Sequence, residues 1–281
     1  MNISMKELNA EGAAEAILDD LSLTSLPIVP DVVREKMAMQ YFPILYEENA
    51  DLKEVLGMTI KRNGGAAIIL NGNIRNEGRK NFTYAHELGH VAMHLVYGTR
   101  SQYVCRESEI SEGPSEVDDW EKEANAFAAS LLMPEKLIHP FIKGGDVGWK
   151  QVNVLAKKCG TSLLATAKRI VRLTKEPLAL IAHKDDLLYC FQKSERFTHY
   201  IDATRFPKNL DSRTLDGSQN SLEDSWDSCW AAEWLGGIST ENKILFDSIS
   251  IPALNWKLTL LWDNYEDADD GKGWAPPKFS Y

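Results

Sequence analysis

Phe82-Thr83-Tyr84-Ala85-His86-Glu87-Leu88-Gly89-His90 contains the pattern H-E-x-x-H. His86 and His90 are four residues apart, so on a helix their imidazoles point the same way. At that spacing both rings can bind one tetrahedral zinc ion through a ring nitrogen, at about 2.0–2.1 Å. Glu87 follows the first histidine, where its carboxylate can accept a proton from a water activated by the metal. The stretch predicts a zinc-binding helix and zinc-assisted hydrolysis. The favoured substrate is a peptide bond.

The same helix does not offer a good third ligand. His94 lies one turn further on, but three histidines along one straight helix cannot all reach one ion. A packing or supporting role is therefore favoured for it over ligation. Met93 and Val96 occupy the places of the glycine and the third histidine in the longer pattern H-E-x-x-H-x-x-G-x-x-H. The third ligand is expected to come from elsewhere in the chain.

A second helix, starting at Asp118 and stopped near Pro134, offers two carboxylates. Glu121 and Glu123 are two residues apart, so only one of them can face the metal. Glu121 lies one turn before Asn125, and this pair suits a carboxylate ligand with an amide that orients another ligand. We favour Glu121 and expect Glu123 to be solvated.

These motifs resemble the ImmA/IrrE family of bacterial metallo-endopeptidases, most closely over residues 58–134. The resemblance rests on F-T-Y-A-H-E-L-G-H and on E-K-E-A-N-A-F-A-A-S-L-L-M-P. It implies a small zincin-like α/β catalytic domain, zinc ligation by His86, His90 and Glu121, and Glu87 as general base. Family members are linked to the cleavage of DNA-binding repressors, so the implied partner is a transcriptional repressor or an antitoxin-like regulator. Many members carry an N-terminal helix-turn-helix, and none is visible here.

Composition limits the other classes of function. The chain has 281 residues and a net charge of −10, which argues against general affinity for nucleic acid or anionic membranes. No apolar run is long enough to span a bilayer, and the N-terminus lacks the pattern of a signal peptide. The four cysteines are scattered, so reduced, buried thiols in a cytoplasmic protein are expected.

The residues before the motif predict a helix over 5–22, a second helix over 30–38 and an extended segment over 41–47. Residues 58–62 and 66–70 flank Asn63-Gly64-Gly65, which is a strong hairpin signal. A strand edge beside a zinc helix can hold an extended peptide by backbone pairing.

Residues 147–175 predict two helices in a helix-turn-helix-like arrangement around Gly160-Thr161-Ser162. Seven basic residues and no acidic residue lie in this segment, as on a surface that contacts DNA. The simpler interpretation is a solvated basic face on a packing module, and we favour it because no base-reading motif is visible. The basic residues are Lys150, Lys157, Lys158, Lys168, Arg169, Arg172 and Lys175.

Residues 176–281 contain 18 acidic and 10 basic residues, a shift in composition that predicts a boundary near residue 175. A hairpin is expected around residues 184–186, a helix over 222–235 with Trp226, Trp230 and Trp234 on one face, and strands over 244–251 and 258–262. The predicted fold class is α/β (α+β). The domains are expected at 1–146 (zincin-like), 147–175 (helix-turn-helix-like), 176–265 (α/β sensor or substrate-docking) and 266–281 (tail).

Three functions are compatible with these features. The first is a zinc endopeptidase with Zn²⁺ as cofactor, and the second is a non-catalytic regulator that binds DNA or a repressor through residues 147–175. The third is a zinc enzyme whose cleft stays closed until a partner or signal arrives. Several residues are candidates for the group that stabilises the oxyanion: His94, Tyr103, His139 and residues of the second half.

Overall fold

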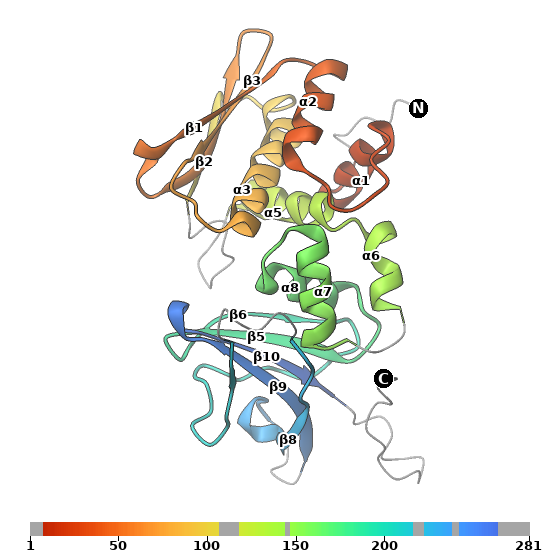
Figure 1. The fold of residues 1–281 in the computed structure, drawn as a ribbon, viewed down its shortest axis with the longest axis vertical. Coiled ribbons are helices and arrows are strands. Elements are labelled where there is room, and N and C mark those ends of the chain that lie inside the picture. Colours follow the sequence, from red (N-terminus) through yellow and green to blue (C-terminus); the bar gives the residue numbers. More distant parts are fainter. Residues whose placement is uncertain (1–7, 107–117, 144–146, 216–221, 238–241, 264–281) are drawn as a thin grey trace. The chain divides into compact units, whose positions relative to one another are not determined.

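A computed structural model describes residues 8–106, 118–143, 147–215, 222–237 and 242–263 (Figure 1). The predicted tail at 266–281 lies outside them. The helices and the two sheets confirm the expected α/β (α+β) class. The chain divides into two compact units, residues 1–138 with 156–162 and residues 139–155 with 163–281. None of the described helices is both long and apolar enough to cross a membrane.

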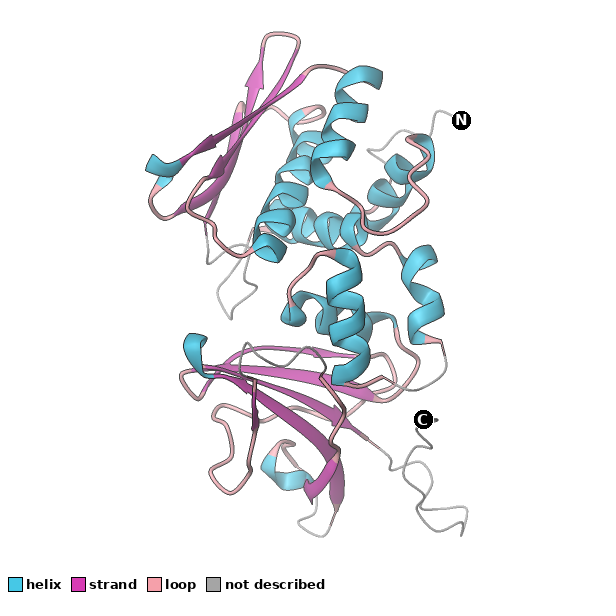
Figure 2. Ribbon diagram, in the orientation of Figure 1, coloured by secondary structure: helices cyan, strands magenta, loops and turns pink. Residues whose placement is uncertain are grey.

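The first unit contains a four-stranded mixed sheet in the order β1-β3-β2-β4. Strand β1 runs parallel to β3, whereas β2 is antiparallel to both β3 and β4. Helices cover one side of this sheet (Figure 2). The elements are α1 (Ala10–Asp20), α2 (Pro30–Gln40), β1 (Ile44–Asn49), β2 (Val55–Arg62), β3 (Gly65–Asn71), α3 (Glu77–Gly89), the π-helical η3 (His90–Leu95), β4 (Gln102–Arg106) and α5 (Asp119–Leu132).

Local sequence explains most of these elements. The predicted hairpin is confirmed as β2 and β3, and Gly64 in its turn has a φ of +77°, which favours glycine. The apolar run of β3 suits a central strand with neighbours on both sides. Helix α1 begins at Ala10, later than the predicted residue 5, because the side chain of Asn9 accepts a hydrogen bond from the Gly12 amide and caps it.

The second unit is built on a sheet in the order β6-β5-β10-β9-β7, with β8 also paired to β9. The two helices predicted for 147–175 are present, and α8 packs on β5 and β6. Trp149, at the start of α7, is fully buried and donates its indole N–H to the Asp247 carbonyl of β9 at 2.9 Å. The elements are α6 (Glu135–Ile142), α7 (Trp149–Cys159), α8 (Leu163–Leu173), β5 (Leu178–Lys184), β6 (Leu187–Lys193), β7 (Arg213–Thr214), β8 (Asp227–Trp230), β9 (Lys243–Ile251) and β10 (Trp256–Trp262). Residues of α6 and α7 belong to both units.

The helix predicted over 222–235 is wrong. Residues 227–230 form β8, which pairs antiparallel with β9, and a short 3-10 turn follows at 231–233. Trp234 is completely buried with Phe206 and His183, but Trp230 is 49% exposed. The i, i+4 spacing of the tryptophans therefore does not define one apolar face, because backbone pairing with β9 sets the local structure.

Candidate metal centre

Helix α3 carries the two histidines of the H-E-x-x-H pattern. The side chain of Asn76 caps its start by accepting a hydrogen bond from the Arg79 amide at 2.9 Å. His86 and His90 are completely buried, and their Nε2 atoms lie 3.0 Å apart. From His90 the helix continues as the π-helical η3, an irregularity that is frequent at functional sites. The two rings therefore face one point, as the spacing predicts.

Helix α5 brings a carboxylate to the same point. Glu121 is 3% exposed. Its Oε2 lies 3.0 Å from Nε2 of His86, and its Oε1 lies 3.3 Å from Nε2 of His90. The two helices approach closely at Gly89, because a Cβ there would stand 3.1 Å from the Phe127 ring. The structure thus turns Glu121, rather than Glu123, toward the histidine pair.

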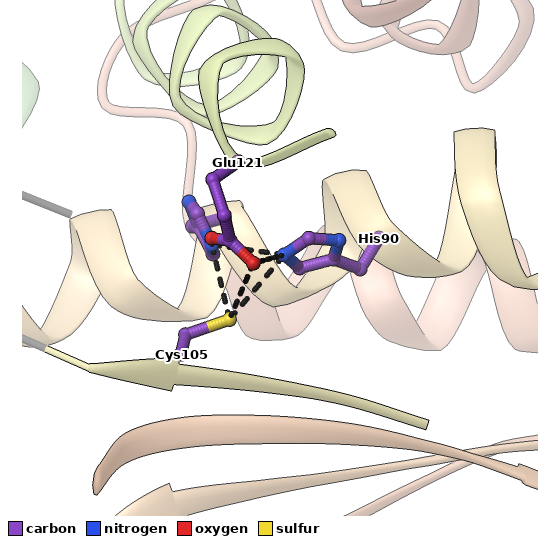
Figure 3. Close-up of side chains that lie close together, drawn as sticks. His90, Cys105 and Glu121 are labelled. Atoms are coloured by element: carbon purple, nitrogen blue, oxygen red, sulfur yellow. Dashed lines mark hydrogen bonds and ion pairs between the residues drawn. The ribbon is translucent and has the colours of Figure 1, made fainter. Parts of the chain in front are cut away.

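Strand β4 supplies a fourth donor that sequence reasoning missed. The Sγ of Cys105 lies 3.1 Å from Nε2 of His86, 3.3 Å from Nε2 of His90 and 3.9 Å from Oε1 of Glu121. Figure 3 shows the sulfur pointing from the strand toward the ring of His90 and the carboxylate of Glu121. One donor atom from each of His86, His90, Cys105 and Glu121 lies within 4.8 Å of the others, the one such group found in the part of the chain that the structure describes.

A signal for Cys105 was present in the sequence. Residues 102–106 alternate between exposed and inward side chains, and Tyr103 and Cys105 are the inward ones. This strand lies between the H-E-x-x-H helix and the glutamate helix along the chain. A cysteine on the inner face of such a strand is a metal-ligand candidate even without a C-x-x-C pair.

Hydrogen bonds around the histidines define which ring nitrogens carry protons. The side-chain oxygen of Asn125 lies 3.0 Å from Nδ1 of His86, so this nitrogen is the donor and Nε2 of the neutral ring keeps its lone pair. Glu123 lies 3.0 Å from Nε2 of His94, and Nδ1 of His94 lies 2.9 Å from Nδ1 of His90. Because Glu123 can only accept, His94 donates to it and accepts from His90. Both Nε2 lone pairs therefore face the carboxylate and the thiol.

The donor set fits zinc. Tetrahedral zinc places two nitrogen ligands about 3.3 Å apart, and a nitrogen and a sulfur about 3.5 Å apart. The observed separations of 3.0, 3.1 and 3.3 Å are close to these values. Oε2 of Glu121 forms no hydrogen bond with any described residue although it is buried, since the nearby Nε2 carries no proton. A bound cation would give this buried carboxylate oxygen a partner and would also accept the lone pairs of the two neighbouring Nε2 atoms.

Glu87 lies beside this group and is completely buried. Its Oε2 accepts a hydrogen bond from Oγ1 of Thr59 at 2.6 Å, while its Oε1 has no hydrogen-bond partner among the described residues. The carboxylate packs against Gly57, where a Cβ would stand only 2.5 Å from Oε1. Burial raises the pKa of Glu87 to about 7, although the neighbouring His86 and Thr59 oppose this rise. Such a carboxyl can take up and release a proton near neutral pH.

The ionisation of the other donors favours their ligand forms. Burial lowers the pKa of His90 to about 4, which keeps its ring neutral. Burial opposes ionisation of Glu121, but its close contacts with the rings of His86 and His90 outweigh burial and lower the pKa to about 2. The neutral His90 ring and the ionised Glu121 carboxylate are thus in the forms that bind metals.

Comparison with known proteins agrees with this geometry. Residues 45–171 match the model of the M78 peptidase family, described as the IrrE N-terminal-like domain. This segment is an IrrE N-terminal-like domain. It includes His86, Glu87, His90, Cys105, Glu121 and Asn125, so the expected family resemblance is confirmed for this part of the chain.

Two further comparisons concern the whole chain. A solved structure described as a Mycobacterium tuberculosis transcriptional regulator is similar at a TM-score of 0.49 and 12% identity, over 90% of this chain and 76% of that one. No curated protein sequence matches the chain.

The other residues that the sequence offered as ligands or oxyanion-stabilising groups lie outside the group of four donors. His94 contacts His90 and Glu123, outside the group of four donors. Tyr103 stacks on the His90 ring, with ring centroids 4.7 Å apart and planes 15° apart. His139 lies on α6, in the second unit. Glu123, expected to be solvated, is 54% exposed but bonds His94.

Proposed function

We propose that this chain is a zinc-dependent endopeptidase that hydrolyses a peptide bond in a protein substrate, a transcriptional repressor or an antitoxin-like regulator. The observation that carries the proposal is the convergence of His86, His90 and Glu121 on one buried point, with Glu87 beside it. This constellation lies within an IrrE N-terminal-like domain.

Each residue has a distinct role in the proposal. His86, His90 and Glu121 hold the ion, and Asn125 keeps the ring of His86 in the ligating tautomer. A zinc ion bound there would supply Lewis-acid polarisation of the scissile carbonyl and activation of a water molecule. Glu87 takes the proton of that water at its unpartnered Oε1 and passes it to the leaving amine. Thr59 orients Glu87 by its bond to the other oxygen.

A peptide substrate suits the sheet next to the site. Strand β4 is an edge strand, paired with β2 alone among the described strands. Its outer backbone groups can hold an extended segment of substrate by strand addition. An extended peptide is also the conformation in which backbone carbonyls alternate and one of them can be presented to the site.

Charge supports a DNA-binding regulator as the substrate. The chain has a net charge of −10, and residues 176–281 contain 18 acidic and 10 basic residues. Proteins that bind DNA present basic surfaces to phosphate. An acidic chain attracts such a partner over a distance of about 10 Å at 0.1 M salt.

The alternative, a non-catalytic regulator that binds DNA through residues 147–175, has less support. Lys150 forms an ion pair with Glu223 at 2.9 Å, and the side chain of Arg169 is buried. At least these two cations are not presented freely to a phosphate backbone. Strongly salt-dependent DNA binding by the purified chain would favour this alternative.

The test is co-expression of the chain with the regulator encoded by the neighbouring gene, followed by mass spectrometry of that regulator. Wild type is expected to produce defined fragments, whereas Glu87→Gln produces none and keeps its zinc. The control is Glu54→Gln, the same chemical change at an exposed position of the same unit. Equal fragment yields from wild type and Glu87→Gln would exclude the proposed mechanism.

A further inference from the structure

The four buried donors and Glu87 suggest two different kinds of zinc site. Structural zinc sites are closed by four protein ligands, whereas catalytic sites keep one position open for water or substrate. His86, His90, Cys105 and Glu121 make a complete set of four. Glu87, in contrast, has the position of a general base, which a purely structural site does not need.

We propose that Cys105 is a fourth, inhibitory ligand, whose thiolate occupies the position that water needs and so keeps the peptidase closed. This inference rests on the proposed zinc site and concerns its regulation. Cys105 must leave the site before hydrolysis can begin.

The distances of Cys105 are those of a ligand. Its Sγ lies 3.1 and 3.3 Å from the Nε2 atoms of His86 and His90, and both nitrogens point their lone pairs toward it. Thiolates are strong ligands of zinc, and binding zinc removes the proton from the thiol.

Ordinary burial of a small thiol does not explain this position. Cys159, Cys190 and Cys229 are also buried thiols outside any disulfide, yet within the described ranges none of them belongs to a metal-binding group. A cysteine that serves only as core packing is surrounded by apolar atoms. The sulfur of Cys105 instead faces two imidazole nitrogens and a carboxylate oxygen.

Strand β4, which carries Cys105, is held next to the site by its pairing with β2 and by a ring contact with His90. Cys105 pairs with Gly57 of β2, and the register shifts between Gly57 and Val55. The extra residue, Leu56, is on β2, opposite the step from Cys105 to Arg106, and bulges of this kind are common next to active sites. Tyr103, two residues earlier on the same face, stacks on His90 and holds this end of the strand against the metal helix. The neighbouring Gly57 leaves room for the Glu87 carboxylate.

The position of β4 in the sheet also makes release feasible. Of the described strands only β2 pairs with it, so moving β4 breaks one ladder of backbone hydrogen bonds and no second one. A partner strand that takes the place of β4 beside β2 would withdraw the sulfur and open the fourth position. Inhibition by Cys105 would therefore make the chain a zinc enzyme whose site stays closed until a partner arrives, the third function compatible with the sequence.

The test uses the full chain loaded with cobalt(II) in place of zinc. A cobalt–thiolate bond gives a sulfur-to-metal charge-transfer band in the near ultraviolet, and wild type is expected to show it. Cys105→Ala and Cys105→Ser are each expected to lose the band while still binding one cobalt. Cys190→Ala, a change at another buried cysteine, is expected to keep it.

A second measurement tests whether the sulfur closes the site, without needing the natural substrate. Acetohydroxamate binds only where a metal position is open. It is expected to perturb the cobalt spectrum of Cys105→Ala at a concentration at least about tenfold lower than that needed for wild type, because a catalytic site needs one open position. Equal affinity of acetohydroxamate for the two proteins would overturn the inhibitory role.

The outcomes separate this inference from the proposed function. One outcome is that wild type binds cobalt without the charge-transfer band, while His86→Ala does not bind cobalt. This outcome overturns the ligand role of Cys105 but supports the proposed metal site. Wild type that binds no cobalt overturns both.

Discussion

The side-chain oxygen of Asn125 and Nδ1 of His86 lie 3.0 Å apart, both buried. This bond makes Nδ1 the protonated nitrogen and leaves Nε2 free to bind a metal. Asn125 is one helical turn after Glu121 on α5, so one helix provides both a carboxylate for the site and the oxygen that orients a histidine.

Removing this oxygen is expected to weaken metal binding. Asn125→Leu should lower zinc affinity by about 10–100-fold, because His86 loses the acceptor that sets its tautomer. Asn125→Asp, which keeps an acceptor oxygen in place, should retain most of the affinity. Competition with a colorimetric zinc chelator measures the difference, and equal affinities for the two variants would contradict the role of the oxygen.

Thr59 is expected to affect catalysis and not metal content. Thr59→Val removes the hydroxyl that donates to Glu87 at 2.6 Å but keeps the volume of the side chain. The buried carboxylate then loses a hydrogen bond worth about 1–3 kcal/mol, and cleavage of the regulator should slow by about tenfold or more. Thr59→Ser restores the hydroxyl and should restore most of the rate. Unchanged cleavage by Thr59→Val at full zinc content would show that Thr59 does not orient Glu87.

Gly57 is expected to tolerate no side chain. A Cβ in Gly57→Ala would stand 2.5 Å from Oε1 of Glu87 and must displace the carboxylate or the strand. A loss of about 1–3 kcal/mol in the free energy of unfolding is expected, together with loss of cleavage. Gly72→Ala is the control, since its Cβ would meet nothing nearer than the Ala50 amide at 3.5 Å. Urea denaturation of both variants measures the difference.

The tryptophans of the second unit should differ widely in their contribution to stability. Trp234→Ala removes a completely buried side chain from the cluster with Phe206 and His183, so a loss of about 3–5 kcal/mol is expected. Trp230 is 49% exposed and lies over Lys243, with the ammonium 5.3 Å from the ring, so Trp230→Ala should cost about 1 kcal/mol or less. Similar losses in urea denaturation would contradict the observed packing.

The metal helix and the direction of Glu121 could be predicted because both depend on local helical geometry. The spacing of His86 and His90, and the choice between Glu121 and Glu123, follow from 3.6 residues per turn. Cys105 could not be found in this way, since only the pairing of β4 with β2 brings it beside residues of α3 and α5. The alternation within residues 102–106 marks Cys105 as an inward side chain, but it does not show which residues the sulfur faces.

The helix expected over 222–235 failed for the complementary reason. Three tryptophans at intervals of four residues imitate a helical face, but pairing with β9 makes residues 227–230 a strand. Glu123 shows a similar limit. Its exposure was expected, whereas its bond to His94, and through it the tautomer of His90, depends on two helices meeting.

The claim on which the account depends most is that His86, His90 and Glu121 hold zinc. Its most direct test is the zinc content of the purified chain after dialysis against metal-free buffer, compared for wild type, Glu121→Ala and Asp119→Ala. One zinc per chain is expected in wild type, with loss in Glu121→Ala and retention in Asp119→Ala, a change at an exposed carboxylate of the same helix outside the donor group. Wild type that retains no zinc, or Glu121→Ala that retains it as tightly as wild type, would contradict the account.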